Sequence, residues 1–422
     1  LVEQKMGNRQ MLEKLETKLK NDLECFSGGA DKFSKIFDNM TSEEKKGIMQ
    51  LVQKSNPQKY KLMRPHVLLF DDIVKLEEEE IQNLLSDINL DTLATALVGV
   101  NQSISDFIMN NLTKSAKDIV SQYLQPLLND GEKICLLVMD CMRFDHFKTM
   151  MPILEPLFNI DLHYCFSLLP TATPYSRNAI FSGLFPDQMV SKYPEQARDM
   201  SQGSSSLNRY EKEFLIDQLN FLGLNDTSFH YHKIWALNEG NKFANRIKDY
   251  AEKELVALVV NFVDILAHKS SQMDILKEMV PDEFGYRTAI RYWLEHSWLL
   301  KVLKYYSERG MTVIMTSDHG SIRVHNDVMV SADRSASSGV RYKYGRNLNS
   351  NKKNTLIINE PKKYRLPEFG PQPTYLIAKN DSYFVYPNEA HKYQGKLKNT
   401  FQHGGISMEE MIIPLAIMKG RG

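Results

Sequence analysis

The chain is poor in cysteine and carries no surplus of charge. Its 422 residues include four cysteines, Cys25, Cys135, Cys141 and Cys165, with no CxxC motif and no paired spacing. Such a pattern is typical of a reduced, intracellular protein. Lysine and arginine together number 52, as do aspartate and glutamate. This balance gives no global argument for nucleic acid or an acidic membrane as a partner and leaves open only a local basic pocket.

Long apolar runs are also missing. No stretch approaches the ~18 consecutive apolar residues of a membrane-spanning helix, and the N-terminus lacks a signal-peptide pattern. We therefore predict a cytoplasmic protein without membrane insertion. The chain opens on Leu1 and not on Met, which leaves room for a further domain ahead of it.

The first part of the chain has a helical pattern. Apolar side chains recur at helical spacing among charges in "NRQMLEKLETKLKNDLECF" and "EEKKGIMQLVQK", which predicts amphipathic helices. We expect an N-terminal helix or linker over residues 1–27 and an all-α domain of short helix pairs over residues 28–128. Thr41 with Glu44, and Asp91, are predicted N-caps.

After residue 128 the pattern changes to buried strands. Three apolar runs, in "ICLLVMD", "LVALVVNFVD" and "MTVIMTSDH", end on Asp140, Asp264 and Asp318. Uninterrupted runs of this kind suit strands that are buried on both faces of a parallel sheet. Helical patterns intervene, so residues 129–422 are predicted to form one α/β domain. Residues 195–210 and 321–375, rich in small and polar side chains, are expected to be insertions or loops.

Polar side chains with metal-binding chemistry gather at the predicted strand ends. Ligands collect beyond the carboxyl ends of strands in open α/β sheets. Asp264 and His268 are four residues apart, which places them on one face of a helix. His319 follows Asp318 directly, and "QHGG" supplies His403 near the C-terminus.

Together with Asp140, these residues give three carboxylates and three imidazoles. That donor set suits Zn²⁺, with Mn²⁺ as an alternative. Six protein ligands exceed the need of one tetrahedral site, so two metals are expected. Two metals ~3.5–4 Å apart can clamp the attacking and leaving oxygens of a displacement at phosphorus.

A nucleophile for such a site could come from "LPTATPYSRNAIFSG". Thr173 precedes Pro174, and the residues after it are predicted to form a helix with proline in its first turn. A hydroxyl there would sit in the positive field of the helix N-terminus. On the local sequence alone, an N-cap role for Thr173 is the stronger alternative to a nucleophile, and both remain open.

The second part of the chain resembles the PglZ domain of the alkaline phosphatase superfamily. The likeness is carried by "LLVMDCMRFDHF", "LPTATPYSRNAIFSGLFP", "NFVDILAHKS", "TSDHGSIRV" and "YQGKLKNTFQHGGISMEEMIIP", and runs through roughly residues 130–417. It is similar in particular to the catalytic half of a response regulator linked to type IX secretion. It implies an alkaline-phosphatase-like sheet with flanking helices.

The resemblance also implies the roles of individual residues. It implies two Zn²⁺ per chain, the first held by Asp140, Thr173, Asp318 and His319, the second by Asp264, His268 and His403. It favours Thr173 as the nucleophile, with Thr171 in support. PglZ domains of this kind are associated with phosphodiesterase activity on cyclic and linear oligonucleotides, which supplies the expected substrate class.

Further residues could assist. Arg143 and Asp145, just past Asp140, could orient metal ligands through hydrogen bonds, and Asn178 could donate to a phosphate oxygen. His146 and His325 are expected to be ordinary surface or loop histidines.

The stretch "SSGVRYKYGRNL" could contact the substrate. It places Arg341, Lys343 and Arg346 among two tyrosines. Basic groups neutralise phosphates and aromatic rings stack on bases. The alternative is a solvated loop whose charges have no role in binding.

The first part of the chain resembles the middle, armadillo-like domain of the flagellar motor switch protein FliG. The likeness covers about residues 28–124 and rests on "GGADKFSKIF" and "ALVGVNQSISDFIMNNLTKSAKDI". It implies a helical-repeat surface for a protein partner, and a homodimer is plausible through it. An EHPQ-type contact motif is absent, which argues against a motor role.

Three functions compete. The first is a zinc-dependent phosphodiesterase, acting on cyclic or linear oligonucleotides through a threonine nucleophile in a signalling or secretion-regulating protein. The second is a metal-binding regulator that senses a nucleotide with little turnover. The third is a phosphomonoesterase. The basic, tyrosine-bearing stretch around residue 342 favours the diester, because a monoester pocket needs less room for a leaving group.

Overall fold

A computed structural model gives the fold. It describes residues 40, 42–64, 69–76, 80–81, 104, 115–201, 208–270, 273–331, 337, 339–368, 373–387 and 396–422. The chain forms two compact units, Leu1–Thr113 and Lys114–Gly422. Within the described ranges, no helix combines the length and apolar character needed to cross a bilayer.

The first unit is helical where it is described. Its elements are α3 (Ser42–Ser55), α4 (Pro57–Met63) and a 3₁₀ turn (Phe70–Lys75). Ile48, Met49 and Met63 are buried against one another. The predicted helix over residues 1–27 and the predicted caps Thr41 and Asp91 lie outside the described residues.

The second unit is built on a six-stranded sheet with the order β2-β14-β5-β1-β4-β3. Its strands are β1 (Ile134–Met139), β2 (Phe158–Phe166), β3 (Phe229–Ile234), β4 (Leu255–Val260), β5 (Thr312–Thr316) and β14 (Ile412–Gly420). Strands β1, β3, β4 and β5 are parallel, and β14 runs antiparallel to β5 and β2. The α/β sheet predicted from the apolar runs is thus confirmed.

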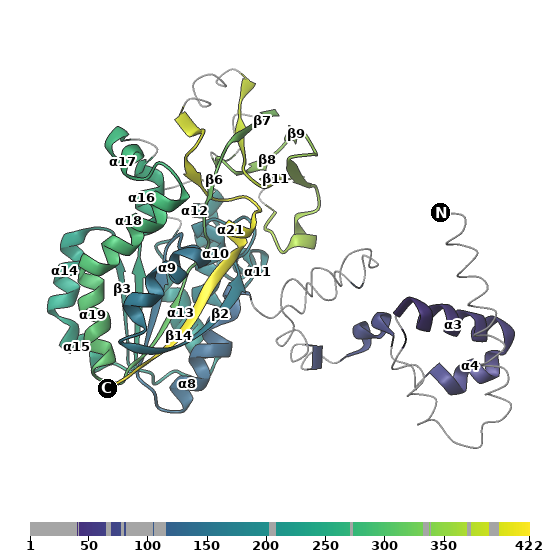
Figure 1. The fold of residues 1–422 in the computed structure, drawn as a ribbon, viewed down its shortest axis with the longest axis horizontal. Coiled ribbons are helices and arrows are strands. Elements are labelled where there is room, and N and C mark those ends of the chain that lie inside the picture. Colours follow the sequence, from purple (N-terminus) through teal and green to yellow (C-terminus); the bar gives the residue numbers. More distant parts are fainter. Residues whose placement is uncertain are drawn as a thin grey trace. The chain divides into compact units, whose positions relative to one another are not determined.

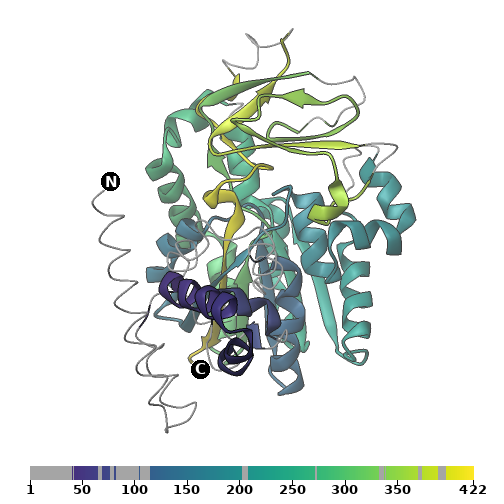
Figure 2. The ribbon, with the colours of Figure 1, turned by 90° about the vertical axis from the view of Figure 1, so that its right-hand side faces the viewer.

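Both faces of this sheet are covered by helices (Figures 1 and 2). One face packs against α9 (Phe144–Leu154), α14 (Leu237–Asn245), α15 (Ile247–Ala251), α18 (Glu283–His296) and α19 (Trp298–Ser307). The other packs against α10 (Thr173–Ser182), α11 (Pro186–Lys192) and α13 (Glu211–Phe221). Successive residues of β1 alternate between the two cores, which explains why its sequence is apolar throughout.

The remaining helices of this unit are short or lie at its edges. They are a 3₁₀ turn (Ala116–Asp118), a π-helical turn (Val120–Leu124), α8 (Gln125–Asn129), α12 (Pro194–Ser201), α16 (Phe262–Ser270), α17 (Asp274–Met279) and α21 (Met408–Met411). The first turns hold Ala116, Ile119 and Leu124 fully buried against the sheet. Residues 115–128, which the sequence pattern groups with the preceding helices, therefore pack with the second unit.

Two segments differ from the sequence pattern. In the first, apolar residues recur at helical spacing across residues 286–310, but the structure divides this stretch into α18 and α19 at Ser297. The backbone of Ser297 is extended, and its side chain accepts a hydrogen bond from the Leu299 amide at 3.2 Å, which caps α19.

The second is residues 321–402, inserted between β5 and β14, which we call the accessory lobe. It holds β6 (Ile322–Arg323), β7 (Asn326–Ser331), β8 (Tyr342–Gly345), β9 (Asn349–Ser350), β10 (Thr355–Ile358), a 3₁₀ turn (Pro361–Tyr364), β11 (Thr374–Ala378), β12 (Ser382–Val385) and β13 (Phe401–Gln402). These strands form three small sheets, drawn together at the top of Figure 1. Each strand pairs with a strand that is distant along the chain, and the segment is polar. These strands were therefore not predicted from the sequence.

Helix α9 offers a test of the fold through pH. Its third residue, His146, is fully buried, and its Nδ1 accepts a hydrogen bond from the Arg143 amide at 3.2 Å. Burial lowers the pKa of His146 to about 3. The unfolded chain, with an ordinary histidine pKa, then binds more protons, so stability falls as pH drops below about 6.5.

We expect this group to cost about 2 kcal/mol of unfolding free energy between pH 7 and pH 5. The variant His146→Gln keeps an acceptor for the capping position and does not titrate. Urea unfolding of both proteins at the two pH values measures the effect. An equal loss of stability in both would contradict the assignment.

Candidate active site

All predicted metal ligands come to one edge of the main sheet. Strands β1, β4 and β5 end at this edge, and β14 begins there because it runs in the opposite direction. Asp140 follows β1, Asp318 and His319 follow β5, and Asp264 lies in the helix after β4. His403 precedes β14. Topology therefore explains why residues far apart in sequence meet.

The first group consists of Asp140, Asp318 and His319, all at most 2% exposed. His319 Nε2 lies 3.7 Å from Asp140 Oδ1 and 3.7 Å from Asp318 Oδ2. Asp318 Oδ1 accepts from the amides of Cys141 at 3.2 Å and His319 at 3.0 Å. Cys141 adopts a left-handed backbone with φ 67°, a costly conformation for a non-glycine residue that directs its amide at Asp318.

The second group consists of Asp264, His268 and His403. Strand β4 ends at Val260, so Asp264 lies in the first turn of α16 and not at the strand end that the sequence suggested. His268, one turn later, has its Nε2 3.3 Å from Asp264 Oδ1 and 3.2 Å from His403 Nε2. Its side chain is 46% exposed, so this group is open to solvent.

Thr171 holds the turn that carries His403. Its hydroxyl donates to the Gly405 carbonyl at 2.8 Å and accepts from the Gly404 amide at 3.1 Å. Its own carbonyl lies 3.2 Å from His403 Nδ1. Since Nδ1 faces that carbonyl, it carries the proton, and Nε2 is left to face Asp264 and His268.

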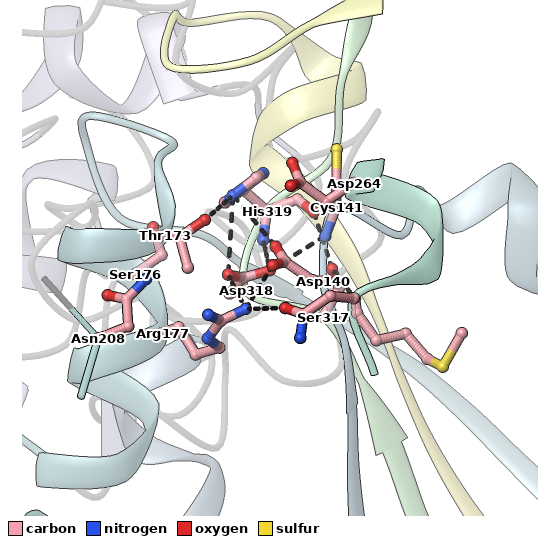
Figure 3. A network of polar contacts seen from close by, with 12 residues as sticks. Asp140, Cys141, Thr173, Ser176, Arg177, Asn208, Asp264, Ser317, Asp318 and His319 are labelled. Carbon is pink, nitrogen blue, oxygen red and sulfur yellow. Dashed lines mark hydrogen bonds and ion pairs between the residues drawn. The ribbon is translucent and has the colours of Figure 1, made fainter. Parts of the chain in front are cut away.

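Thr173 is the first residue of α10, and its hydroxyl faces the first group. The N-cap is Ala172, so the N-cap role for Thr173 is wrong. Thr173 Oγ1 lies 3.1 Å from His319 Nε2, and Figure 3 shows it directed toward that ring. Pro174 occupies the first turn, as the sequence predicts. A nucleophilic role for Thr173 stays a prediction.

Arg177 is a buried member of the site that sequence reasoning missed. It is 1% exposed, and its guanidinium donates to Asp140 Oδ2, to Asn261 Oδ1 at 3.2 Å and to Glu211 Oε1 at 2.7 Å. It also lies 3.7 Å from Asp318 Oδ2. Figure 3 shows it beneath the two aspartates. One signal could have found it, because Arg177 is four residues after Thr173 and so shares its helix face.

Burial and charge shift the carboxyl pKa values of the two groups in opposite directions. Burial raises the pKa of Asp140 to about 8, aided by Asp318 and Asp264 and opposed by Arg177. Burial likewise raises the pKa of Asp318 and lowers those of His319 and His403. The pKa of Asp264 is lowered: burial opposes ionisation, but the His268, His403 and His319 rings outweigh it. The hydrogen bond to Asp264 raises the pKa of His268.

The donor atoms fit metal ions. One buried oxygen on each aspartate of the first group, Asp140 Oδ1 and Asp318 Oδ2, accepts no hydrogen bond. In the second group, Asp264 Oδ1 faces the Nε2 atoms of His268 and His403 at 3.3 and 3.5 Å. The donor atoms within each group lie within 4.8 Å of one another. Two ligand atoms that share a tetrahedral zinc at about 2.1 Å would be about 3.4 Å apart, close to the 3.3 and 3.7 Å separations in the two groups. Neutral imidazoles and carboxylates are also the donors that zinc takes.

The residues predicted to contact the substrate differ from one another in their exposure to solvent. Arg341 and Lys343 are buried, at 0% and 3% exposure. Arg341 is bound by Glu410, and Lys343 donates to the Gly339 carbonyl at 3.0 Å. Both are therefore withdrawn from solvent, which corrects the expectation of a substrate contact. Arg346 is exposed, and Asn178, 1% exposed, donates to the Pro174 carbonyl at 2.8 Å within its helix.

Arg143 is likewise committed to carboxylates beside the site. It forms ion pairs with Asp145 at 2.8 Å and Glu283 at 2.5 Å, and Arg287 reaches Asp145 at 3.2 Å. This network links the segment after Asp140 to the start of α18. Glu283 was not anticipated from the sequence. His146 is buried, contrary to the surface position expected for it, and His325 hydrogen-bonds Asn399 in the accessory lobe.

Two family models match the chain. The model of the BREX system PglZ alkaline phosphatase-like domain matches residues 119–418. The model of the FliG C-terminal domain matches residues 50–129. The likeness to FliG that the sequence indicates is thus found, and the matching model is that of its C-terminal domain, where the sequence suggested the middle domain.

Individual curated proteins give the likeness to FliG. The flagellar motor switch protein FliG of Thermotoga maritima is 30% identical over 110 residues, 25% of this chain and 33% of that protein. FliG of Borreliella burgdorferi is 25% identical over 116 residues, 28% of this chain and 34% of that protein. The chain thus spans about a third of the length of these curated relatives.

Among solved structures, murine ectonucleotide pyrophosphatase/phosphodiesterase 5 aligns with a TM-score of 0.45 at 12% identity, covering 68% of this chain and 88% of that one. The human protein aligns with a TM-score of 0.44 at 11% identity, covering 68% and 87%.

Proposed function

The chain belongs to the family of PglZ alkaline phosphatase-like domains, and on that premise we propose that it is a two-metal phosphodiesterase with Thr173 as its nucleophile. An alkaline phosphatase-like domain is a phosphoesterase. The single observation that carries the finer proposal is the hydroxyl of Thr173, half-buried and 3.1 Å from His319 Nε2. It lies beside a group of donors that fits a metal ion.

The residues of the chain divide the work. Asp140, Asp318 and His319 would hold one Zn²⁺, and Asp264, His268 and His403 the other. When bound, the ions supply positive charge that favours an ionised hydroxyl and neutralises charge developing on phosphate oxygens. Arg177 fixes Asp140 through its second oxygen, which leaves Oδ1 directed into the site.

The proposed reaction has two displacements at phosphorus. Thr173 Oγ1 forms a bond to phosphorus, the ester oxygen of one alcohol leaves with the electron pair, and that alcohol takes a proton. Water then attacks the phosphothreonine ester, so that the Thr173 oxygen leaves and regains a proton. The products are one alcohol and one phosphate monoester. Covalent catalysis of this kind replaces one difficult step by two easier ones.

Charge matching favours a diester substrate over a monoester. Among the described residues, the arginines around the site are each bound to a carboxylate: Arg143 to Asp145, Arg177 to Asp140, and Arg341 to Glu410. A phosphate monoester, with its second pKa near ~6, carries almost two charges at neutral pH. A phosphate diester carries one negative charge, so its binding requires fewer cationic side chains that are not already paired with a carboxylate. This argument replaces the one from the basic stretch around residue 342.

A substrate comparison tests this choice. We expect bis(p-nitrophenyl) phosphate to be hydrolysed with a kcat/KM at least about tenfold above that of p-nitrophenyl phosphate, as the charge argument requires. The reverse order would favour a monoesterase. Cyclic and linear dinucleotides, assayed in parallel, test the oligonucleotide class. Recovery of every ligand unchanged would favour the sensing regulator.

Metal removal is expected to affect activity and stability together. The buried carboxylates of Asp140 and Asp318 lose a compensating charge when zinc is chelated. We expect hydrolysis to stop and the unfolding free energy to fall by about 3–4 kcal/mol for each ion removed, relative to protein with zinc at 100 to 1,000 times its Kd. Denaturant unfolding with EDTA, then with zinc restored, measures this. Mg²⁺ should not restore either property, because imidazole ligands disfavour it, and restoration by Mg²⁺ would contradict the zinc assignment.

The setting of the enzyme is also a proposal. The match to FliG supports a protein partner, or a second copy of this chain, as the binder of the first unit. Three buried cysteines without disulfides, Cys135, Cys141 and Cys165, support a reducing, cytoplasmic location. A role in signalling or secretion control stays a prediction from the resemblance.

A further inference from the structure

A buried ion pair lies behind the second metal group. Arg341, in the accessory lobe just before β8, and Glu410, in α21, are both fully buried. The guanidinium binds the carboxylate with two hydrogen bonds, Nε to Oε1 at 2.7 Å and Nη2 to Oε2 at 2.7 Å. It also donates to the carbonyls of Asn380, at 2.7 Å, and Ser382. This is the paired geometry of strong arginine–carboxylate contacts.

The Glu410 carboxylate also binds the turn that carries His403. Glu410 Oε1 accepts from the Gly405 amide at 2.8 Å. A Cβ atom on Gly405 would lie 2.3 Å from Arg341 Nη2 and 2.7 Å from the Ala378 carbonyl. The backbone of Gly405 therefore packs directly on the guanidinium, and only glycine fits there. From Gly405, hydrogen bonds through Thr171 reach Gly404 and His403.

The first metal group has separate supports. Asp140 is held by Arg177, and Asp318 by the amides of Cys141 and His319. These side chains bond neither Arg341 nor the Glu410 carboxylate. The two groups still touch, because the His403 and His319 rings stack with their centroids 4.2 Å apart and the Glu410 carbonyl accepts from the Gly320 amide at 3.0 Å. A change at the ion pair should thus affect the second group directly and the first group only through these contacts.

We propose that Arg341 and Glu410 are a positioning pair for His403, which sets the affinity of the second metal position more strongly than that of the first. The inference rests on the proposed function, since it assigns a metal to each group. It gives the accessory lobe a role in the site, because Arg341 and its two carbonyl acceptors belong to that lobe. Partners that orient metal ligands typically change metal affinity by about 10–100-fold when mutated.

Zinc titration of Arg341→Met tests the proposal. Metal-free protein is titrated against a chromogenic chelator, and the folded state is checked by circular dichroism. Wild type should bind two zinc ions. The variant should bind the ion of the second group about 10–100-fold more weakly and the ion of the first group with a smaller loss of affinity. Arg341→Lys restores the charge without the planar fork and should recover part of the loss.

Two further variants keep the test decisive. Glu410→Gln retains an acceptor for the Gly405 amide and loses the charge pair, so it decides the question if Arg341→Met does not fold. Lys362→Met removes an exposed ion pair with Glu368 in the same lobe and should bind both ions as wild type does.

The outcomes separate this inference from the proposed function. Two ions bound with wild-type affinity, or an equal weakening of both in a folded variant, would overturn the positioning pair alone. A wild-type protein that takes up fewer than two zinc ions would overturn the two-metal function and the pair together.

Discussion

Replacing Thr173 by alanine is expected to lower the turnover of a phosphodiester by about 10⁴–10⁶-fold, the loss seen when a covalent nucleophile is removed. The helix should survive, because Ala172 is the N-cap and Thr173 makes no capping bond. Asp140, Asp318 and His319 all remain, so the metal content should stay at two ions per chain. Initial rates with a chromogenic diester, together with metal analysis, measure both effects.

Thr171→Val is the matched comparison, because it removes the other hydroxyl of the same segment. Thr171 contacts Gly404 and Gly405 and not the first metal group. Its loss should weaken the second metal position and lower turnover less than Thr173→Ala does. Thr173→Ser, which keeps a hydroxyl, should retain measurable turnover. Undiminished hydrolysis by Thr173→Ala would contradict the proposed mechanism.

Replacing Arg177 by methionine is expected to cost about 3–5 kcal/mol of unfolding free energy in metal-free protein. The loss leaves Asp140 without its guanidinium partner and the buried Glu211 carboxylate with Lys233 as its remaining cation, at 3.2 Å. Removing one partner of a buried pair is costly because the other charge stays desolvated. Denaturant unfolding measures the difference. Bound zinc should reduce the difference in unfolding free energy between the variant and wild type, since the ions would compensate part of the same negative charge.

Arg291→Met provides the control. Arg291 pairs with Glu295 at 3.0 Å on the surface, with the two side chains 50% and 35% exposed. Its removal should cost less than about 1 kcal/mol. A metal-free Arg177→Met protein within that margin of wild type would show that the buried cation is dispensable.

The position of the site could be predicted from the sequence because it follows from topology. Parallel strands with buried residues on both faces are visible as apolar runs, and their carboxyl ends must share an edge. Asp140 follows such a run directly, and Asp318 follows one after Ser317. His268 follows from helical spacing once Asp264 is known. His403 was also a candidate ligand from the sequence, but its assignment to the second metal needed the family resemblance, because the antiparallel direction of β14 cannot be read from its letters.

The supporting residues could not be predicted in the same way. Arg341 looks like a solvated cation in a polar segment, and its partner Glu410 is 69 residues away. Burial of both decides its role, and burial depends on how the accessory lobe pairs its short strands. Arg177 and Glu211 are 34 residues apart and come from different helices. Such pairs are set by tertiary packing, which leaves no periodic signal in sequence.

The steric course at phosphorus tests the central claim most directly. Each in-line displacement inverts the configuration of a chiral phosphorothioate diester, so attack by Thr173 followed by water gives net retention. Hydrolysis in ¹⁸O-labelled water, followed by configurational analysis of the product, makes the measurement. The account predicts retention. Net inversion would show that water attacks the diester in a single step, and would contradict a nucleophilic Thr173.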